Sequence, residues 1–549
     1  MKFRRFMSTE FQKKDWLPFF PHTKPRKEQI DAIDFTINTL KKTNKRFVVI
    51  EAGTGVGKSA VGLTVSRYLR SQFSDKEFDS GAYFLTTQKI LQDQYVKDFG
   101  SSMGMKSIKS STNYQCGYLK QNTCAESMRA LRSTEKESKL YKACTFNCIY
   151  KKEKERFLKA DSSVTNFPYF LAETNYSGKI TPREILVIDE AHNAAEELSK
   201  FIEVVVTERF SKQVLKLTMP KFKTQTEAFT WINSTYHPKL SSHIKHIEKI
   251  LEKYSGLKDK LQEFVGIAKQ FDMLDKHACK LNRFLELYQK DNWVANLVPA
   301  EGRSGKKIEF KPIDVSAYAE NMLFRLGKKI VCMSATILNI ESYCTMLGIK
   351  KEDCEFISIP SPFPIENRPI IACGVGSMSS NNIENTLPRL AQAVREILKN
   401  HPNEKGIIHC HTFKIANYLK RNIRSQRLIT HDSSNRDDVL KKHIKSKNAS
   451  VLLSPSMTEG VDLKGDCSRF QIICKIPYPY LGDKLIRKKM NKWRWWYPLK
   501  TAKTIVQASG RSVRSIDDNA ITYILDSDWS RFYGKNKKYF PEDFSNCIS

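Results

Sequence analysis

The sequence predicts an α/β protein with two parallel sheets. Short apolar runs alternate with longer helical patterns in two separate regions of the chain. This alternation favours parallel strands, because each crossover helix packs on the sheet that it connects. A chain of 549 residues with 40% hydrophobic residues is also too long for one core and has enough apolar material for several. We therefore expect three or four domains, two of them built around such sheets.

The expected strands fall into two sets of four. The first set is "KRFVVIEAG", "GAYFLTT", "EILVIDEAH" and "KKIVCMSAT", and the second is "KGIIHCHT", "SVLLSPS", "RFQIICKIP" and "AITYILDSD". Between the last two strands of the first set, residues 200–305 carry apolar residues at helical spacing and many lysines, so we expect an inserted helical domain there. Parallel sheets bind ligands at the carboxyl ends of their strands, which directs attention to the residues that follow each run.

The segment "RFVVIEAGTGVGKSA" combines a buried strand, a glycine-rich turn and a helix start. The pattern from Ala52 to Ser59 is a P-loop, in which backbone N–H groups converge on phosphate, Lys58 reaches the β- and γ-phosphates, and Ser59 ligates Mg²⁺. An ordinary glycine-rich turn is the alternative, and the strand–turn–helix context argues against it. The predicted nucleotide-binding residues here are Gly53, Thr54, Gly55, Gly57, Lys58 and Ser59.

The segment "EILVIDEAHN" supplies two acidic residues directly after an apolar strand. Asp189 can hold the Mg²⁺ through water, and Glu190 can orient and deprotonate the attacking water. A helix N-cap pair is the alternative for an isolated Asp-Glu. With a P-loop upstream, the pair instead predicts ATP hydrolysis.

Composition limits the remaining functional classes. Lys and Arg number 91 against 59 Asp and Glu, which gives a formal net charge of +32 and favours a polyanionic partner such as nucleic acid, although a lysine-rich solvated surface is the alternative. No apolar run is long enough to cross a bilayer, and the N-terminus has no signal-peptide core, so we expect a soluble intracellular protein away from membranes. Thirteen cysteines in such a chain indicate reduced thiols or metal ligands.

The order of the motifs resembles the XPD/DinG-like branch of superfamily 2 helicases. The P-loop and "DEAHN" are similar to motifs I and II, and "PRKEQIDAI" to the Q-type motif; "YFLTTQKILQDQYVKDF", "SATI" and "GIIHCHTFKIANYL" are similar to motifs Ia, III and IV. "TEGVDLKG" and "QASGRSVRS" resemble motifs V and VI. The resemblance implies two tandem RecA-like motor domains, with ATP and Mg²⁺ as ligands.

The resemblance also implies roles for residues outside the P-loop. Arg26 and Gln29 are expected near the adenine, and Gly460 and Asp462 are expected to report the ATP state to the bound strand. Gln507, Arg511 and Arg514 follow one another at i, i+4 and i+7, which predicts one helix face that brings two guanidinium groups to the γ-phosphate. Domain closure is then required for hydrolysis.

Four cysteines lie in one short basic segment between motifs Ia and II: Cys116, Cys124, Cys144 and Cys148. A small iron–sulfur domain occupies this place in the XPD/DinG-like branch. Four thiolates with loose spacing can hold a [4Fe–4S] cluster, whereas structural zinc more often uses tight C-x2-C pairs. The cysteines alone leave the cluster, zinc and unliganded buried thiols open. The resemblance favours the cluster.

The domain organisation implied by the resemblance has two insertions in the first motor domain. We expect that motor domain in residues 1–100, 166–199 and 306–348, an iron–sulfur insertion in 101–165, a helical arch-like insertion in 200–305 and a second motor domain in 349–549. The first motif begins at Pro25, so we expect no nuclease domain before it, and no long C-terminal extension. His409 and His411 alternate along the motif IV strand, where we expect a satisfied structural pair rather than a metal site.

The predicted function is an ATP-dependent helicase that translocates 5′→3′ on single-stranded DNA and unwinds duplex DNA, with polarity implied only by the resemblance. The alternative is a nucleic-acid-stimulated ATPase that displaces proteins or acts on RNA or RNA–DNA hybrids. We expect a monomer that acts on single-stranded and forked DNA, in repair or replication, and that can meet loading or repair proteins. The expected location is the cytoplasm of a bacterial or virus-infected cell, or a nucleus.

Overall fold

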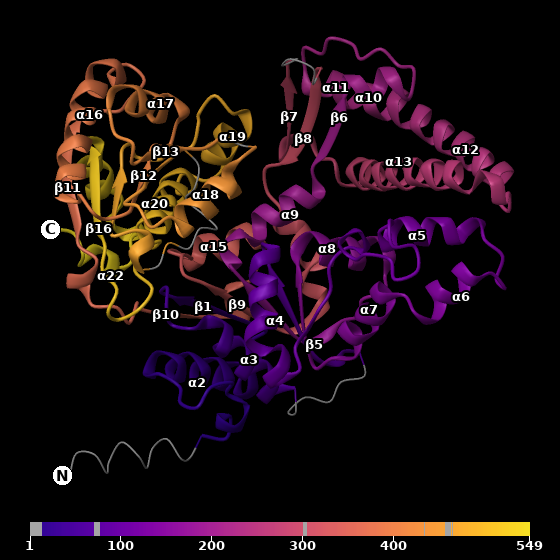
Figure 1. The fold of residues 1–549 in the computed structure, drawn as a ribbon, viewed down its shortest axis with the longest axis horizontal. Coiled ribbons are helices and arrows are strands. Elements are labelled where there is room, and N and C mark those ends of the chain that lie inside the picture. Colours follow the sequence, from indigo (N-terminus) through magenta and orange to yellow (C-terminus); the bar gives the residue numbers. More distant parts are fainter. Residues whose placement is uncertain (1–13, 71–76, 300–304, 433, 456–462, 464) are drawn as a thin grey trace.

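The computed structural model describes residues 14–70, 77–299, 305–432, 434–455, 463 and 465–549. Two parallel sheets form the centres of two lobes, and a third, smaller sheet lies apart from both (Figure 1). Two groups of helices extend from the first lobe toward the same side of the molecule (Figure 1). Among the described residues, no helix has both the length and the apolar character needed to cross a membrane.

The sheet of the first lobe has seven strands in the order β10-β1-β9-β5-β2-β4-β3. All of its strand pairs are parallel, as the alternation of strands and helices predicts. Its strands are β1 (Phe47–Ala52), β2 (Asp79–Thr86), β3 (Lys106–Ser107), β4 (Ser162–Asn166), β5 (Arg183–Asp189), β9 (Gly327–Ser334) and β10 (Cys354–Ile359). The three strands that precede the P-loop, the acidic pair and motif III are neighbours, so their carboxyl ends meet at one edge.

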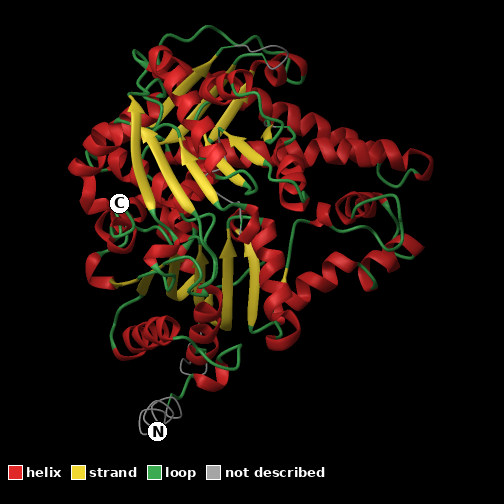
Figure 2. Ribbon diagram, turned by 60° about the vertical axis from the view of Figure 1, so that its left-hand side comes forward, coloured by secondary structure: helices red, strands yellow, loops and turns green. Residues whose placement is uncertain are grey.

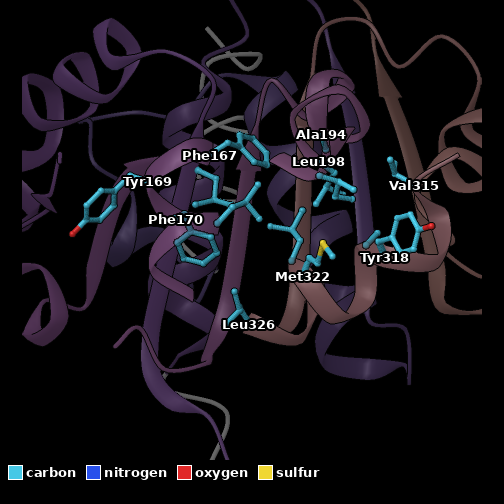
Figure 3. Packing of buried hydrophobic residues seen from close by; sticks show 14 of the residues in the cluster. Phe167, Tyr169, Phe170, Ala194, Leu198, Val315, Tyr318, Met322 and Leu326 are labelled. Carbon is cyan, nitrogen blue, oxygen red and sulfur yellow. The ribbon is translucent and has the colours of Figure 1, made fainter. Parts of the chain in front are cut away.

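Helices cover both faces of this sheet. On one face lie α2 (Lys27–Lys42), α3 (Lys58–Leu69) and α4 (Lys89–Met103). On the other lie α8 (Phe167–Ala172), α9 (Ala194–Ile202), α14 (Ser316–Met322) and α15 (Ile340–Leu347). Figure 3 shows Phe167 and Phe170 of α8, Ala194 and Leu198 of α9, and Met322 of α14 within one apolar layer. This layer fixes α9, and therefore the acidic motif before it, against the sheet.

The second lobe has a six-stranded sheet in the order β11-β16-β15-β12-β14-β13, again with parallel pairs (Figure 2). Its strands are β11 (Ile370–Gly376), β12 (Gly406–His409), β13 (Leu428–Thr430), β14 (Val451–Ser454), β15 (Phe470–Ile473) and β16 (Ile521–Asp526). Its helices are α16 (Ile383–Asn400), α17 (Phe413–Asn422), α18 (Arg436–Lys445), α19 (Lys484–Lys492), α20 (Trp496–Ser509), α21 (Asp528–Asn536) and α22 (Glu542–Ser545). One apolar cluster covers one face of this sheet, and two further clusters, one of them small, cover the other face.

The predicted boundary between the motor domains at residue 349 is wrong. Strand β10 pairs in parallel with β1 of the first lobe from Cys354 to Ile359, so the chain leaves the first sheet only after Ile359. The sequence around β10, "CEFISI", is short and partly polar, because an edge strand needs fewer apolar residues than a central strand.

The insertion at 200–305 is not wholly helical. It contains α10 (Glu208–Gln213), α11 (Gln225–Trp231), α12 (His237–Tyr254) and α13 (Leu261–Leu287). It also supplies β6 (Val204–Thr207) and β7 (Trp293–Val298), which flank β8 (Lys307–Pro312) in an antiparallel sheet. The expectation of an all-helical insertion followed only the central lysine-rich helices. On either side of these helices, the β-branched run "VVVT" and the segment "WVANLV" form strands instead.

The cysteine-bearing segment forms α5 (Cys124–Ala130), α6 (Lys139–Phe146) and α7 (Ile149–Lys159). It contacts the neighbouring insertion through Asp272 of α13. The Arg129 Nε lies 2.7 Å from one oxygen of that carboxylate, and the Arg132 Nη1 lies 2.9 Å from the other. The two insertions therefore touch in space although Arg129 and Asp272 are 143 positions apart in the chain.

Candidate functional site

The glycine-rich loop between β1 and α3 lines a cavity of about 790 Å³ between the two lobes. Gly55 and Gly57 both have a φ of +84°, a backbone region that side chains disfavour. A Cβ added at Gly55 would also overlap the ring of Phe363, in the segment that joins the lobes. Lys58 begins α3, and its Nζ donates to the carbonyl oxygen of Ala52 at 3.1 Å. The ammonium group therefore lies across the loop whose N–H groups can bind phosphate.

The acidic pair faces the same cavity. Asp189 ends β5 and is 7% exposed; its Oδ2 accepts from the Tyr95 hydroxyl at 2.9 Å and its Oδ1 from the Glu190 N–H at 2.9 Å. Glu190 has a φ of 51°, which is rare for a residue with a side chain and is typical of strained functional positions. Burial, and secondarily the Asp189 carboxylate, raise the pKa of Glu190. A raised pKa suits a carboxylate that must accept a proton.

Arg511 and Arg514 reach this cavity from the second lobe. Their charges act on Glu190 and, like that of Lys58, oppose the rise of its pKa. The prediction that both share a helix face with Gln507 is wrong, because α20 ends at Ser509 and both arginines follow that end. Gly510 has low helix propensity, which favours an end at this point. The turn still directs both arginines into the cavity.

Gln507, in the last turn of α20, joins the second lobe to two motifs of the first. Its Nε2 lies 2.9 Å from the His192 Nε2 and 3.1 Å from the Thr336 Oγ1. The His192 Nδ1 in turn lies 2.7 Å from the Ser334 hydroxyl. Burial, with the charges of Lys503 and Lys500, holds the pKa of His192 well below its ordinary value, so the ring is neutral and can accept from Gln507. The Gln507 Oε1 is buried without a partner among the described residues, and it can accept from a water in the cavity.

The remaining predicted nucleotide contacts differ in placement. Gly53, Thr54 and Ser59 line the cavity. Arg26 and Gln29 are not among its lining residues and contact the P-loop from outside: the Arg26 Nη1 donates to the carbonyl oxygen of Gly55 at 2.6 Å. The Arg26 backbone N–H also donates to the Gln29 Oε1 at 3.0 Å at the start of α2. Their contact with adenine stays a prediction.

The motif V residues Gly460 and Asp462 lie outside the described residues. The predicted satisfied pair of His409 and His411 is not met at His409: its two buried ring nitrogens make no hydrogen bond of good geometry among the described residues, although the Gln471 side chain lies near the ring. His411 is satisfied, because its Nε2 lies 3.3 Å from the Tyr478 carbonyl oxygen.

The four clustered cysteines line a second cavity, of about 300 Å³. A short hairpin brings the first two together, since the Cys116 N–H donates to Asn122 at 2.9 Å and the Cys124 N–H to Tyr114 at 2.8 Å. Cys144 projects from α6, and Cys148 precedes α7. The Leu119 N–H donates to the Cys116 Sγ at 3.3 Å, as it would to a thiolate ligand. None of the four forms a disulfide, and among the described residues no three Cys, His, Asp or Glu side chains form a group that fits a single metal ion.

Comparison with known proteins supports the assignment of both lobes. Residues 22–220 match the family described as type III restriction enzyme, res subunit, and residues 394–547 match the family described as helicase C-terminal domain. The ATP-dependent DNA helicase YoaA of Escherichia coli K12 is 21% identical over an alignment that covers 92% of each chain. A solved XPD helicase, 18% identical, has a TM-score of 0.62 and covers 94% of this chain and 98% of its own. The Xpd4 structure from S. tokodaii, 15% identical, has a TM-score of 0.56 and covers 95% and 99%.

These matches support an XPD/DinG-like helicase of superfamily 2. Its two lobes are the tandem RecA-like domains of that fold. In this helicase the fold explains why residues far apart in the sequence meet in one cavity.

Sequence reasoning missed three residues of the nucleotide site of this helicase. Tyr95 fixes Asp189 from α4, and His192 links the acidic motif to Gln507. Glu51, buried in β1, accepts from the Leu338 N–H and from the Ser358 hydroxyl at 3.2 Å, and burial raises its pKa. A charged residue inside the apolar run "FVVIEA" was the available signal for Glu51. Nothing in the spacing indicates Tyr95.

Proposed function

We propose that the chain hydrolyses ATP to move 5′→3′ along single-stranded DNA and to unwind duplex DNA. The observation that carries the proposal is one cavity of about 790 Å³, which the P-loop and the acidic motif line together with Arg511 and Arg514 of the second lobe. Such a nucleotide site is complete only when both motor domains contribute residues to it. Hydrolysis can then be coupled to a change in the distance between the domains.

Within this site each group has a distinct proposed role. Lys58 binds the β- and γ-phosphates, and Ser59 with Asp189 holds Mg²⁺. Glu190 accepts a proton from the attacking water, which the free Oε1 of Gln507 helps to orient. Arg511 and Arg514 stabilise the charge on the transferred phosphoryl group.

We also propose that Cys116, Cys124, Cys144 and Cys148 hold a [4Fe–4S] cluster. The support is a cavity of about 300 Å³ that all four cysteines line. Its volume is larger than one metal ion requires. When bound, the cluster would cross-link four separate elements of this segment and fix its shape. The chain's own contribution is the hairpin around Cys116 and Cys124 and the contact of Arg129 with Asp272.

The proposed substrate is DNA rather than RNA. The YoaA relatives and the DinG relative from Photobacterium profundum are named as ATP-dependent DNA helicases, and the net charge of +32 suits a nucleic-acid track. We assign the first motor domain to residues up to 359 without the two insertions, and the second to the residues from 360 onward, because β10 belongs to the first sheet.

The test combines three assays on the purified full chain. ATP hydrolysis is measured with single-stranded DNA and with RNA of the same sequence, and unwinding is measured on duplexes with either a 5′ or a 3′ tail. We expect stimulation by DNA and unwinding of the 5′-tailed duplex. Removal of streptavidin from biotinylated DNA without strand separation would instead identify a protein-displacing translocase. Stronger stimulation by RNA would overturn the assignment to DNA.

A further inference from the structure

Tyr480, in the loop between β15 and α19, is 80% exposed. The loop around it is held firmly. The Tyr478 hydroxyl donates to the Asp528 Oδ2 at 2.6 Å, and its ring stacks on that of Tyr497 at 5.9 Å between centroids. The Tyr497 hydroxyl donates to the carbonyl oxygen of Pro479 at 3.0 Å. An aromatic ring on an ordered loop therefore faces solvent. Exposed apolar surface of this kind is typical of a binding site.

The ring packs against the backbone of Gly482. A Cβ added at Gly482 would overlap the ring and the hydroxyl of Tyr480, although the backbone there does not have the positive φ that requires glycine. Glycine at this position thus leaves room for the ring beside the backbone. Most of the residue stays open to solvent.

Helix α19 follows directly and carries a basic face. Asp483 caps it by accepting from the Leu485 N–H at 2.7 Å, and the helix sequence "KLIRKKMNK" has no acidic residue. Lys484, Arg487 and Lys488 are exposed, and no ion pair joins them to any side chain in the described part of the chain. Phosphates are attracted to such a face, and they occur at regular intervals along a nucleic-acid strand.

The loop leads into a helix that contacts the first lobe. Helix α19 stands on the side of the second lobe that faces the small β6–β8–β7 sheet (Figure 1). The Lys492 Nζ of α19 lies 2.6 Å from the Asp314 Oδ2, just after β8. Tyr480 is not among the residues that line the nucleotide cavity.

We propose that Tyr480 is a stacking platform for one base of a single-stranded DNA, whose phosphates lie along Lys484, Arg487 and Lys488. This proposal rests on the proposed DNA-dependent function and adds a specific contact to it. A base stacks on an aromatic face whatever its sequence, so the contact suits a protein that moves along DNA of any sequence. The basic face beside the ring favours a nucleic acid over an apolar protein surface.

The first experiment removes the ring. The dissociation constant of a fluorescein-labelled 20-nucleotide oligothymidylate is measured by anisotropy for the full chain and its variants. We expect Tyr480→Ala to raise the Kd about tenfold, the range of one lost stacking contact. Tyr480→Phe keeps the ring and should stay within about twofold of the wild type. Leu481→Ala, the neighbouring exposed apolar residue, is the matched control and should leave the Kd unchanged.

The second experiment displaces the ring without removing it. Gly482→Ala places a Cβ where the Tyr480 ring lies, so it should weaken DNA binding in the wild type. In the Tyr480→Ala background the same change should have no further effect, because no ring remains to be displaced. An abasic strand of equal length should bind equally to the wild type and to Tyr480→Ala.

The outcomes separate this proposal from the proposed function. A wild type that binds no single-stranded DNA would overturn both. A wild type that binds DNA, together with a Tyr480→Ala variant of equal affinity, would overturn the stacking platform alone and make a protein surface the better occupant of the ring. A loss of affinity for the abasic strand in Tyr480→Ala would also overturn it, since that strand has no bases to stack.

Discussion

Glu190 shows how single residues shape the nucleotide site. Its left-handed backbone, with a φ of 51°, costs a residue with a side chain about 1 kcal/mol. The same conformation lets its N–H donate to the Asp189 Oδ1 while its own carboxylate faces the cavity, where the charge of Lys58 acts on it. The chain therefore spends conformational energy to separate two adjacent carboxylates into two roles.

At this scale we predict that Lys58→Ala lowers the rate of ATP hydrolysis about 100-fold or more, the effect of removing a charge-stabilising donor. Binding of single-stranded DNA should change little, because the basic groups proposed to contact it lie elsewhere. Phosphate release and DNA anisotropy provide the two readouts. Lys42→Ala, an exposed lysine at the end of α2, is the control. Normal turnover in Lys58→Ala would show that the P-loop assignment is wrong.

A second residue-scale prediction concerns His409. Burial, together with the charge of Arg511, lowers its pKa from 6.5 to about 4. Below pH 6.5 the unfolded chain binds a proton that the folded chain does not. The free energy of unfolding should therefore decrease as the pH is lowered from about 6.5 to 4. One such group contributes up to about 1.4 kcal/mol per pH unit.

The measurement is urea unfolding of the full chain at several pH values, monitored by tryptophan fluorescence. His409→Gln cannot take up this proton, so its stability should depend less steeply on pH than that of the wild type. Parallel curves for the two proteins would contradict the assigned pKa. His22→Gln, in the first lobe, is the control and should match the wild type.

At the scale of elements, the sequence predicts central features better than edges. The strands around the P-loop and the acidic motif were predictable because buried parallel strands read as continuous apolar runs. Strand β10 and the sheet β6–β8–β7 were not, because edge strands and short antiparallel strands have mixed composition. The end of α20 before Arg511 is another local matter, set by one glycine. Lys58, Glu190 and Arg511, which the motifs single out, line one cavity, whereas Arg26 and Gln29 do not. Contacts such as that of Tyr95 with Asp189 depend on tertiary packing.

The cysteine-bearing segment gives the prediction for this scale. Replacing Cys144 with Ser should lower the iron content and the visible absorption of protein purified without oxygen, because one of four thiolates is lost. We expect much of the ATP hydrolysis to remain and unwinding of a forked duplex to be lost. Cys279→Ser, on α13 outside the cysteine-lined cavity, should retain iron and both activities. A fully active Cys144→Ser variant without iron would contradict a structural cluster.

At the scale of the whole molecule, α20 supplies several contacts between the lobes, in addition to the pair of Lys492 in α19 with Asp314. Besides the Gln507 contact with His192, the Lys503 Nζ donates to the carbonyl oxygen of His192 at 3.1 Å, and Lys500 pairs with Glu196 of α9. This partly buried pair lowers the pKa of Glu196 to about 2, although burial alone would raise it. The acidic motif and α9 are therefore bonded directly to α20 of the second lobe.

The last prediction tests this division of the site between lobes. Arg511 belongs to the second lobe, whereas Lys58 and Glu190 belong to the first, so an ATP molecule bound to the first lobe lacks part of its charge stabilisation until the lobes close. Arg511→Ala should therefore lower kcat by about 10³-fold, in the range of a lost arginine finger. The affinity for ATP should change far less, because the P-loop supplies most of the ground-state contacts.

The decisive comparison is between kcat from steady-state hydrolysis and the Kd from titration with a fluorescent, non-hydrolysable ATP analogue. Arg395→Ala, an arginine of α16 whose Nη2 donates to the carbonyl oxygen of Asn422, changes the same residue type away from the cavity and should leave both quantities unchanged. If Arg511→Ala instead raised the Kd of the analogue as much as it lowered kcat/KM, the guanidinium would act on the ground state. Lobe closure would then follow from ATP binding and not be reserved for the transition state.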